Sequence, residues 1–289
     1  MQYRSNSILA HIPQTTDGIN ILKQAVFFSR VLGMRIFLMD IIRAGTLFYS
    51  SQKLKKNQEK IQNELNKFTE FIRNSLQKEI PREIIPRIGW GKIVNTLIAE
   101  SERGGYEFVM IDKSEKKNAE GLTRAEVDRY VSKSYCPVLL IDKNYPVDKI
   151  DKIVIPIDIS QQTKKRLYWA TFFAKKFNAK IQIVSALNVD IKETKSLAHK
   201  NAENLRRILE ERGVNCEVQI LKVHNREIHS AILEYIEQEN PGLIIIRTHQ
   251  EIRFSGRKIG KFVSEIIHGC KIPVFTVGGV TQNFDINAI

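Results

Sequence analysis

Residues 151–187 read DKIVIPIDISQQTKKRLYWATFFAKKFNAKIQIVSAL, and residues 7–42 read SILAHIPQTTDGINILKQAVFFSRVLGMRIFLMDII. Each stretch starts with an apolar run, passes through a polar turn into an amphipathic segment with two adjacent phenylalanines, and ends in a second apolar run. This order is typical of a strand, a helix and a second strand. The chain therefore contains one structural unit twice.

The later parts of the two copies correspond as well. Phe108–Asp112 and Leu243–Arg247 are short apolar runs, and Pro137 and Pro273 then open the final apolar runs. Apolar runs with little alternation are typical of strands that are buried on both faces of a parallel sheet. With helical segments between the strands and right-handed crossovers, the pattern predicts an α/β fold with a doubly wound parallel sheet in each copy.

The expected elements can be placed along the chain. Strands of the second copy are expected at residues 153–157, 181–186, 216–223, 243–246 and 274–277. Apolar residues at helical spacing form one face in each copy: Leu54, Ile61, Leu65, Phe68, Ile72 and Leu76 in the first, and Leu197, Ala198, Ala202, Leu205, Ile208 and Leu209 in the second. The Pro-containing segment 142–149 is the expected linker, which predicts domains at residues 1–145 and 146–289.

Length and composition agree with two globular units. The 289 residues allow two domains of roughly 140 residues, and no apolar run approaches the ~20 residues that a membrane helix needs. We therefore expect no membrane partner. The start of the chain passes directly into an expected strand without a signal peptide, and the three cysteines form no CxxC pair. A reduced, cytoplasmic protein is therefore expected.

The net charge of +13 is spread over the whole chain. Residues 1–145 hold 23 Lys and Arg against 16 Asp and Glu, a difference of +7, and residues 146–289 hold 22 against 16, a difference of +6. An even distribution favours a solvated basic surface. Non-specific nucleic-acid binding through this surface is the less favoured alternative, because the sequence has no helix-turn-helix, RNA-recognition or zinc pattern.

The chain resembles the universal stress protein family in its tandem form. The segments KIVIPIDIS (152–160), IIIRTHQ (244–250) and IGKFVSEIIHGCKIPVFTV (259–277) carry the resemblance best, and it extends over nearly the whole chain. Family membership implies, in each copy, a Rossmann-like sheet of five parallel strands in the order 3-2-1-4-5 with helices on both faces. It also implies a cytoplasmic role in stress response, frequent dimerisation and, in one branch, ATP binding.

The nucleotide-binding branch of the family carries a loop with the pattern Gly, two residues, Gly, nine residues, and Gly followed by Ser or Thr. Glycines let backbone N–H groups approach phosphate oxygens without a Cβ in the way. The second copy retains the spacing, but Arg247 and Gln250 replace the first two glycines. Gly260 is retained, and Lys261 follows it. Asp158 matches the acid that contacts the nucleoside, although a strand-end acid can instead cap a helix.

The resemblance implies a nucleotide site where the first and fourth strands of the second copy diverge, at the switch point of the sheet. Its candidate residues are Pro156, Ile157, Asp158, Ile246, Gly260, Lys261 and Phe262. Side chains that can bind an anion in place of the missing glycines are Arg247, Arg253 and Arg257. A solvated basic loop is the favoured interpretation of this charge run. ATP or another adenine nucleotide is the only cofactor indicated, and no catalytic or metal-binding residue is identified.

The first copy departs further from the family pattern. Pro13 stands at the position of the acid, Gly121 is out of register, and Arg124 stands near the expected Gly-Ser pair. Without glycines, a close backbone cradle for phosphate is sterically unfavourable. We therefore interpret the first copy as structural and expect any nucleotide in the second copy.

These features favour a non-enzymatic stress-response protein that acts through conformation or partner binding, with weak or lost ATP binding. The alternative is an adenine-nucleotide-binding stress protein or a hydrolase that uses the C-terminal crevice. The turns after both first strands lack the SGGxDS loop of such hydrolases. We expect the copies to pair within the chain through Val138–Ile141 and Val274–Val277, because bare edge strands favour aggregation. A homodimer is a further open alternative.

Overall fold

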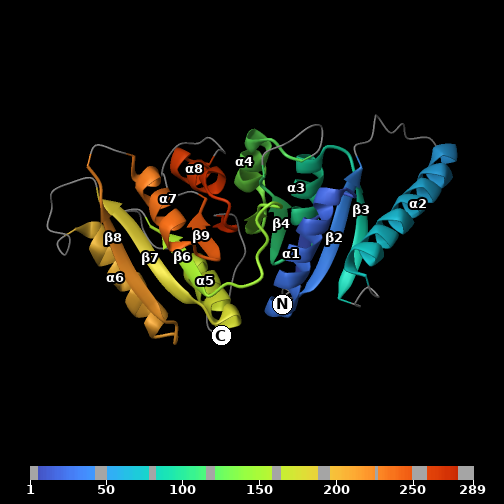
Figure 1. Cartoon of the computed structure of the whole chain (residues 1–289). Coiled ribbons are helices and arrows are strands. Elements are labelled where there is room, and N and C mark those ends of the chain that lie inside the picture. Colours follow the sequence, from blue (N-terminus) through green and yellow to red (C-terminus); the bar gives the residue numbers. More distant parts are fainter. Residues whose placement is uncertain are drawn as a thin grey trace.

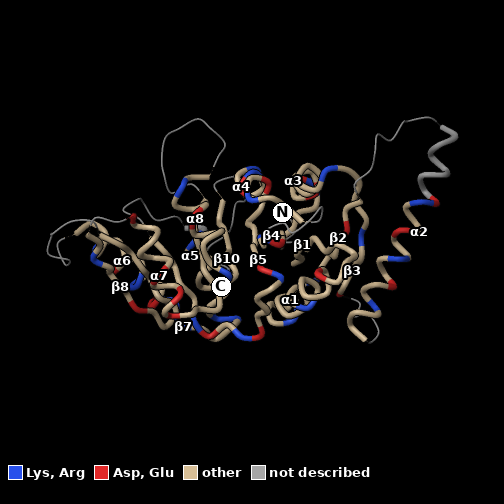
Figure 2. Tube along the Cα trace, turned by 45° about the horizontal axis from the view of Figure 1, so that its top comes forward, with Lys and Arg blue, Asp and Glu red and all other residues tan. Residues whose placement is uncertain are grey.

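A computed structural model of the chain describes residues 6–42, 51–77, 83–114, 121–157, 164–187, 196–224, 227–248 and 259–278 (Figure 1). Strands and helices alternate along this part of the chain in two successive sets, which we call the N-terminal half and the C-terminal half. None of the described helices is both long and apolar enough to cross a membrane. Figure 2 shows basic and acidic residues interspersed over both halves.

Each half has the same order of elements. The N-terminal half contains β1 (Ser7–His11), α1 (Thr16–Leu32), β2 (Arg35–Ile42), α2 (Ser51–Leu76), β3 (Ile84–Trp90), α3 (Ile93–Arg103), β4 (Phe108–Asp112), α4 (Arg124–Lys133) and β5 (Val138–Ile141). The C-terminal half contains β6 (Lys152–Pro156), α5 (Lys164–Phe177), β7 (Lys180–Leu187), α6 (Leu197–Glu210), β8 (Cys216–Lys222), α7 (Ile228–Glu239), β9 (Leu243–Arg247), α8 (Lys261–Gly269) and β10 (Val274–Val277). The strands expected in the second copy are confirmed to within about one residue at each end.

The described strands form one ten-stranded sheet in the order β3-β2-β1-β4-β5-β10-β9-β6-β7-β8. Within each half the order along the sheet is 3-2-1-4-5, which confirms the order that the family resemblance implied. Neighbouring strands within a half are parallel. Strands β5 and β10 pair antiparallel, with Leu139 opposite Phe275, and this pair joins the two units into one sheet.

Helices cover both faces of the sheet (Figure 1). One apolar core lies between the strands and α1, α2, α5 and α6, and a second lies between the strands and α3, α4, α7 and α8. Leu139 and Leu140 are adjacent in β5 and both fully buried, but they belong to different cores. Burial on both faces explains why the strand sequences are almost continuously apolar.

Aromatic side chains of the repeated stretches meet between the halves. Phe177 in α5 stacks on Phe27 in α1 at 6.0 Å and meets Phe28 edge-on at 5.8 Å. On the same face, Phe173 in α5 meets Phe275 in β10 edge-on at 4.8 Å. Aromatic pairs at such distances contribute beyond their buried area, so the two halves share one core on this face.

The expected helical faces are buried only in part. In α2, Phe68 and Ile72 are fully buried, but Ile61 is 40% exposed. Leu197, the first residue of α6, is 62% exposed. Ile61 and Leu197 thus lie on the expected helices but outside the buried part of each apolar face. The side chain of Leu54 lies outside the described part of the molecule.

Candidate functional site

The crevice at which the nucleotide site is expected lies beyond the C-terminal ends of β6 and β9, which are neighbours in the sheet. After β6 the chain continues to α5 on one face of the sheet, and after β9 it continues to α8 on the other face. Such a switch point leaves a crevice outside the strand ends, where ligands of open α/β sheets bind.

The strand residues that border this crevice are held firmly by the fold. Pro156 ends β6, and the next residue, Ile157, is 3% exposed. The N–H of Ile157 donates to the Val184 carbonyl at 2.8 Å, and its carbonyl accepts from Ser185 Oγ at 3.1 Å. Ile246 in β9 is fully buried in the core beneath α7 and α8. Ile157 and Ile246 therefore shape the crevice from below, and neither presents an exposed side chain to a ligand.

Helix α8 begins at the crevice without a capping side chain. Gly260 is its N-cap, in an extended conformation with φ −69° and ψ 159°, and its carbonyl accepts from the Ser264 N–H at 3.1 Å. The N–H groups of residues 261–263 have no acceptor within the helix itself. Together with the helix dipole, they favour an anion at this position. Phe262 is half-buried and packs against the core on this face.

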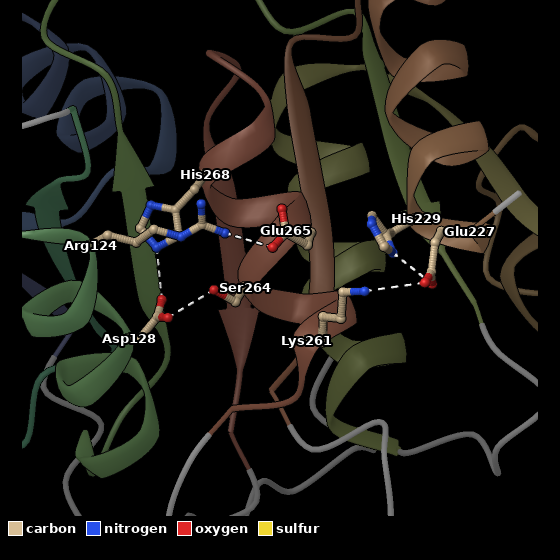
Figure 3. A network of polar contacts seen from close by, with 8 residues as sticks. All are labelled: Arg124, Asp128, Glu227, His229, Lys261, Ser264, Glu265 and His268. Carbon is tan, nitrogen blue, oxygen red and sulfur yellow. Dashed lines mark hydrogen bonds and ion pairs between the residues drawn. The ribbon is translucent and has the colours of Figure 1, made fainter.

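Lys261, the first residue of α8, is engaged by an acid from the neighbouring helix (Figure 3). Its Nζ lies 3.2 Å from Glu227 Oε1, and Glu227 is the N-cap residue of α7. The other carboxylate oxygen of Glu227 lies 3.7 Å from His229 Nδ1. Lys261 and Glu227 are each 64% exposed, so this pair lies at the solvent-facing rim of the two helix termini.

Several expected site residues cannot be placed. Asp158, Gln250, Arg253 and Arg257 lie outside the described residues, so contact of these residues with a nucleotide stays a prediction. Arg247 lies at the end of β9 and is half-buried. The described candidates come together at one end of the C-terminal half, since they lie at the ends of adjacent strands and at the start of α8.

In the equivalent crevice of the N-terminal half, the described polar groups bind one another. Asp112 at the end of β4 accepts from the Ser114 N–H at 3.1 Å, the Ser114 hydroxyl at 2.7 Å and the Lys143 N–H at 3.2 Å. The Lys143 side chain then forms an ion pair with Asp17, at 2.6 Å, in the first turn of α1. A cavity of about 20 Å³ lies between these groups, beside Pro13, and it has room for about one water molecule.

Electrostatics also distinguish the two crevices. Burial raises the pKa of Asp112, and its hydrogen bonds to Ser114 and Lys143 oppose this shift. With Asp17, the N-terminal crevice presents two carboxyl groups and one ammonium group among the described residues that line it. In the C-terminal crevice, Lys261 pairs with Glu227, and Arg247 lies at the end of β9. Among the described residues, no group of His, Cys, Asp and Glu side chains is arranged to hold a metal ion.

Contacts between α4 and α8 join the two halves next to the C-terminal crevice (Figure 3). Asp128 in α4 accepts from Ser264 Oγ at 2.8 Å and lies 2.7 Å from His268 Nε2. One turn away, Arg124 pairs with Glu265 at 2.9 Å. Helix α8 is therefore held along its side by the other half of the molecule.

Sequence analysis missed Glu227, Asp17 and Lys143. Glu227 carries a local signal, because an acid directly before a helix is favoured by the helix dipole. The pair of Asp17 and Lys143 joins residues 126 positions apart, and no local pattern in the sequence indicates it.

Comparisons with known proteins agree with this architecture. Residues 149–278 match the model of the universal stress protein family. The chain is similar in structure to a universal stress protein from Archaeoglobus fulgidus, with 18% identity, a TM-score of 0.67, and coverage of 96% of this chain and 99% of that one. A putative universal stress protein from Pseudomonas aeruginosa has 17% identity and a TM-score of 0.63, over 94% of this chain and 93% of that one.

At these identities the solved structures establish the fold and nothing further. A search of curated proteins found no match. The family model covers the elements from β6 to β10, which include the crevice with α8. The N-terminal half repeats the same strand order. Residues 149–278 therefore form a domain of the universal stress protein family.

Proposed function

We propose that this protein is a non-enzymatic stress-response module whose C-terminal half binds an adenine nucleotide weakly, in the crevice at β6, β9 and α8. The observation that carries this proposal is the start of α8, which opens on Gly260 with no capping side chain. Phosphate is the kind of ligand that such a helix terminus favours. Lys261, at the first position of the helix, adds a side-chain donor at the same end.

Three features argue that the affinity is low. Arg247 and Gln250 carry side chains where the family pattern has glycines, so the backbone cannot approach the phosphates closely on that side. Lys261 is already paired with Glu227. The carboxylate of Glu227 also places a negative charge next to the expected phosphate position. We expect a dissociation constant between about 10 μM and 1 mM, which corresponds to roughly −4 to −7 kcal/mol.

The N-terminal half is proposed to serve as a scaffold without a ligand of its own. The ion pair between Lys143 and Asp17 lies in its crevice, and only a small cavity lies between the described side chains. Asp112 and Asp17 would also repel phosphate oxygens. A ligand in this crevice would have to displace both acids from their present hydrogen bonds.

The absence of catalysis is part of the proposal. At the described border of the C-terminal crevice, His229 faces Glu227, and Glu227 also binds Lys261. This arrangement engages the imidazole and the carboxylate with each other and pairs neither with a nucleophilic side chain. We therefore expect the protein to respond to a nucleotide by conformation or partner binding, in the cytoplasm, without cleaving it.

Calorimetric titration with ATP, combined with ³¹P NMR of the same samples, tests this function. We expect weak binding, and no phosphate release over hours. Lys261→Gln should weaken binding about three- to tenfold through loss of a charged donor. Lys133→Gln, at the exposed C-terminal end of α4, is the matched control and should bind like the wild type. Submicromolar affinity or phosphate release would contradict the proposal.

We also propose that the two halves act as one intramolecular pair. Strands β5 and β10 each have a neighbour on both sides, so neither offers a free edge to a second molecule. The free edges of the described sheet are β3 and β8. A homodimer formed by strand pairing would therefore have to use β3 or β8. Light scattering after size-exclusion chromatography measures the mass and decides between a monomer and a dimer.

A further inference from the structure

A buried lysine joins the two halves at the C-terminal end of α8. Lys113 follows β4 in the N-terminal half and is 6% exposed. Its ammonium group donates to three backbone carbonyls of the other half: Ile267 at 2.8 Å, Cys270 at 2.8 Å and Ile272 at 2.9 Å. An ammonium group has three protons, which three carbonyls can accept, and the Cys270 Sγ lies 3.6 Å away as a weaker acceptor. Lys113 thus closes the last turn of α8 from the opposite half of the molecule.

This contact satisfies carbonyl groups at the C-terminal end of α8. The last carbonyls of a helix have no partner within it and carry the negative end of its dipole, so a cation is favoured there. Burial lowers the pKa of Lys113, because removal from water disfavours the charged form. The three carbonyls offset that cost by accepting charge-assisted hydrogen bonds.

Other apolar and polar contacts of α8 come from both halves of the molecule. Val263, Ile266 and Ile267 are fully buried in the core that both halves share on this face, which sets the height of the helix above the sheet. Lys261 pairs with Glu227 of the same half, whereas the other described polar contacts come from the N-terminal half, from Asp128 and Arg124 on its side and from Lys113 at its end. A helix of nine residues has little stability of its own.

We propose that Lys113 is a positioning residue that holds α8 so that its first turn faces the nucleotide crevice. This inference rests on the function proposed above. Nine residues span roughly 13 Å, so a 10° tilt about the C-terminal end moves the first turn by about 2 Å. A displacement of that size exceeds the tolerance of a hydrogen bond to phosphate. The N-terminal half would thus control ligand affinity in a site that it does not contact.

Lys113→Met tests the proposal, with Lys152→Met as the matched control. Lys152 Nζ donates to the Glu239 carbonyl at 3.0 Å at the end of α7, so it performs the same task within one half. We expect Lys113→Met to weaken ATP binding about tenfold, as for the loss of one charge-assisted hydrogen bond, and Lys152→Met to change it less than about twofold.

Hydrogen exchange supplies a readout that does not depend on the nucleotide. Without ligand, the amides of residues 265–269 should exchange faster in Lys113→Met and at the wild-type rate in Lys152→Met. Addition of ATP should slow these amides in the wild type, although they lie at the far end of α8, and should have no such effect in Lys113→Met. If Lys113 served stability alone, ATP would slow these amides equally in the wild type and in Lys113→Met.

The outcomes separate the two proposals. Failure of the wild type to bind ATP would refute the proposed function. Equal α8 exchange in the wild type and Lys113→Met, or equal ATP affinity, would refute the positioning role. If Lys113→Met does not fold, Asp128→Asn decides in its place, because it weakens the side anchor formed with Ser264 and His268. Unchanged affinity and unchanged α8 exchange in Asp128→Asn would then reject the proposal.

Discussion

The ring of Phe108 in β4 meets the ring of Phe275 in β10 edge-on, with the centroids 5.5 Å apart. One residue belongs to each half, and both rings are fully buried. Trp169 in α5 contacts both rings, at 5.9 Å and 4.9 Å. This cluster spans the antiparallel strand pair, so the core of one half is continuous with the core of the other.

Because the cluster is shared, we expect the two halves to unfold in one transition. The two tryptophans report on them separately, since Trp90 lies in β3 and Trp169 in α5. In urea titrations, Trp90→Phe and Trp169→Phe should each give one transition, with the same midpoint by fluorescence and by circular dichroism. Phe275→Ala should lower the free energy of unfolding by about 3–5 kcal/mol, the usual cost of an aromatic cavity.

The matched control for this cavity is Ile61→Ala, at a side chain in α2 that is 40% exposed. Its cost should stay within about 0.5 kcal/mol, as for most surface substitutions. Two separate urea transitions, one for each tryptophan, would show that the halves fold independently and would contradict the shared core.

Glu227 is predicted to compete with the ligand for Lys261. Glu227→Gln keeps the shape of the side chain but removes its charge, which releases Lys261 and raises the potential at the start of α8. We expect ATP to bind about two- to fivefold more tightly, the range for an exposed ion pair. Calorimetry at two salt concentrations measures the effect, which should shrink as salt increases.

Glu211→Gln is the control for this prediction. Glu211 pairs with Arg207 at 3.7 Å and is similarly exposed. It lies at the C-terminal end of α6, whereas Lys261 and Glu227 lie at the N-terminal ends of their helices. It should leave ATP affinity unchanged. Weaker binding by Glu227→Gln would show that Glu227 assists the ligand.

The ion pair in the crevice of the N-terminal half is predicted to have no role in ligand binding. Lys143→Met removes the ion pair with Asp17, which is 54% exposed, so its cost in stability should be below about 1 kcal/mol. ATP affinity, measured by calorimetry, should stay within about twofold of the wild type. A larger change in affinity would place the nucleotide in the N-terminal crevice.

The thiols are predicted to differ in reactivity. Burial raises the pKa of Cys136 to about 12 and that of Cys216 to about 11. At pH 8 their thiolate fractions are therefore on the order of 0.01% and 0.1%. Iodoacetamide should label the half-buried Cys270 first in the native protein, as measured by mass spectrometry. Cys136 and Cys216 should be labelled rapidly only in urea.

The same shifts predict a loss of stability at alkaline pH. Above pH 9, the thiols of the unfolded chain release protons that Cys136 and Cys216 retain in the native state. The stabilisation is complete below pH 9 and declines as the pH rises toward 11–12. Replacement of both by Ala should reduce this slope in urea titrations. Rapid labelling of Cys136 in the native state at pH 8 would contradict the burial argument.

The order of strands and helices along the chain could be predicted from the sequence, whereas the order 3-2-1-4-5 within the sheet was implied by the family resemblance. Runs such as Leu243–Arg247 are apolar at almost every position, and this pattern requires burial on both faces wherever the strand lies in the sheet. Gly260 lies at the start of α8, where the family pattern places its glycine, and its contact with a nucleotide stays a prediction. These features depend on local sequence, which acts over a few residues.

The long-range contacts of the two lysines Lys143 and Lys113 were decided by the tertiary structure. Lys143 reaches Asp17 over 126 positions, and Lys113 reaches Ile267 over 154. A lysine has the same sequence signature whether it is solvated or buried, because its partner is chosen by the packing of distant elements. The sequence by itself determined which segments become strands and helices, through periodicity. Only the folded sheet, by bringing β4 beside the end of α8, decided which charges meet.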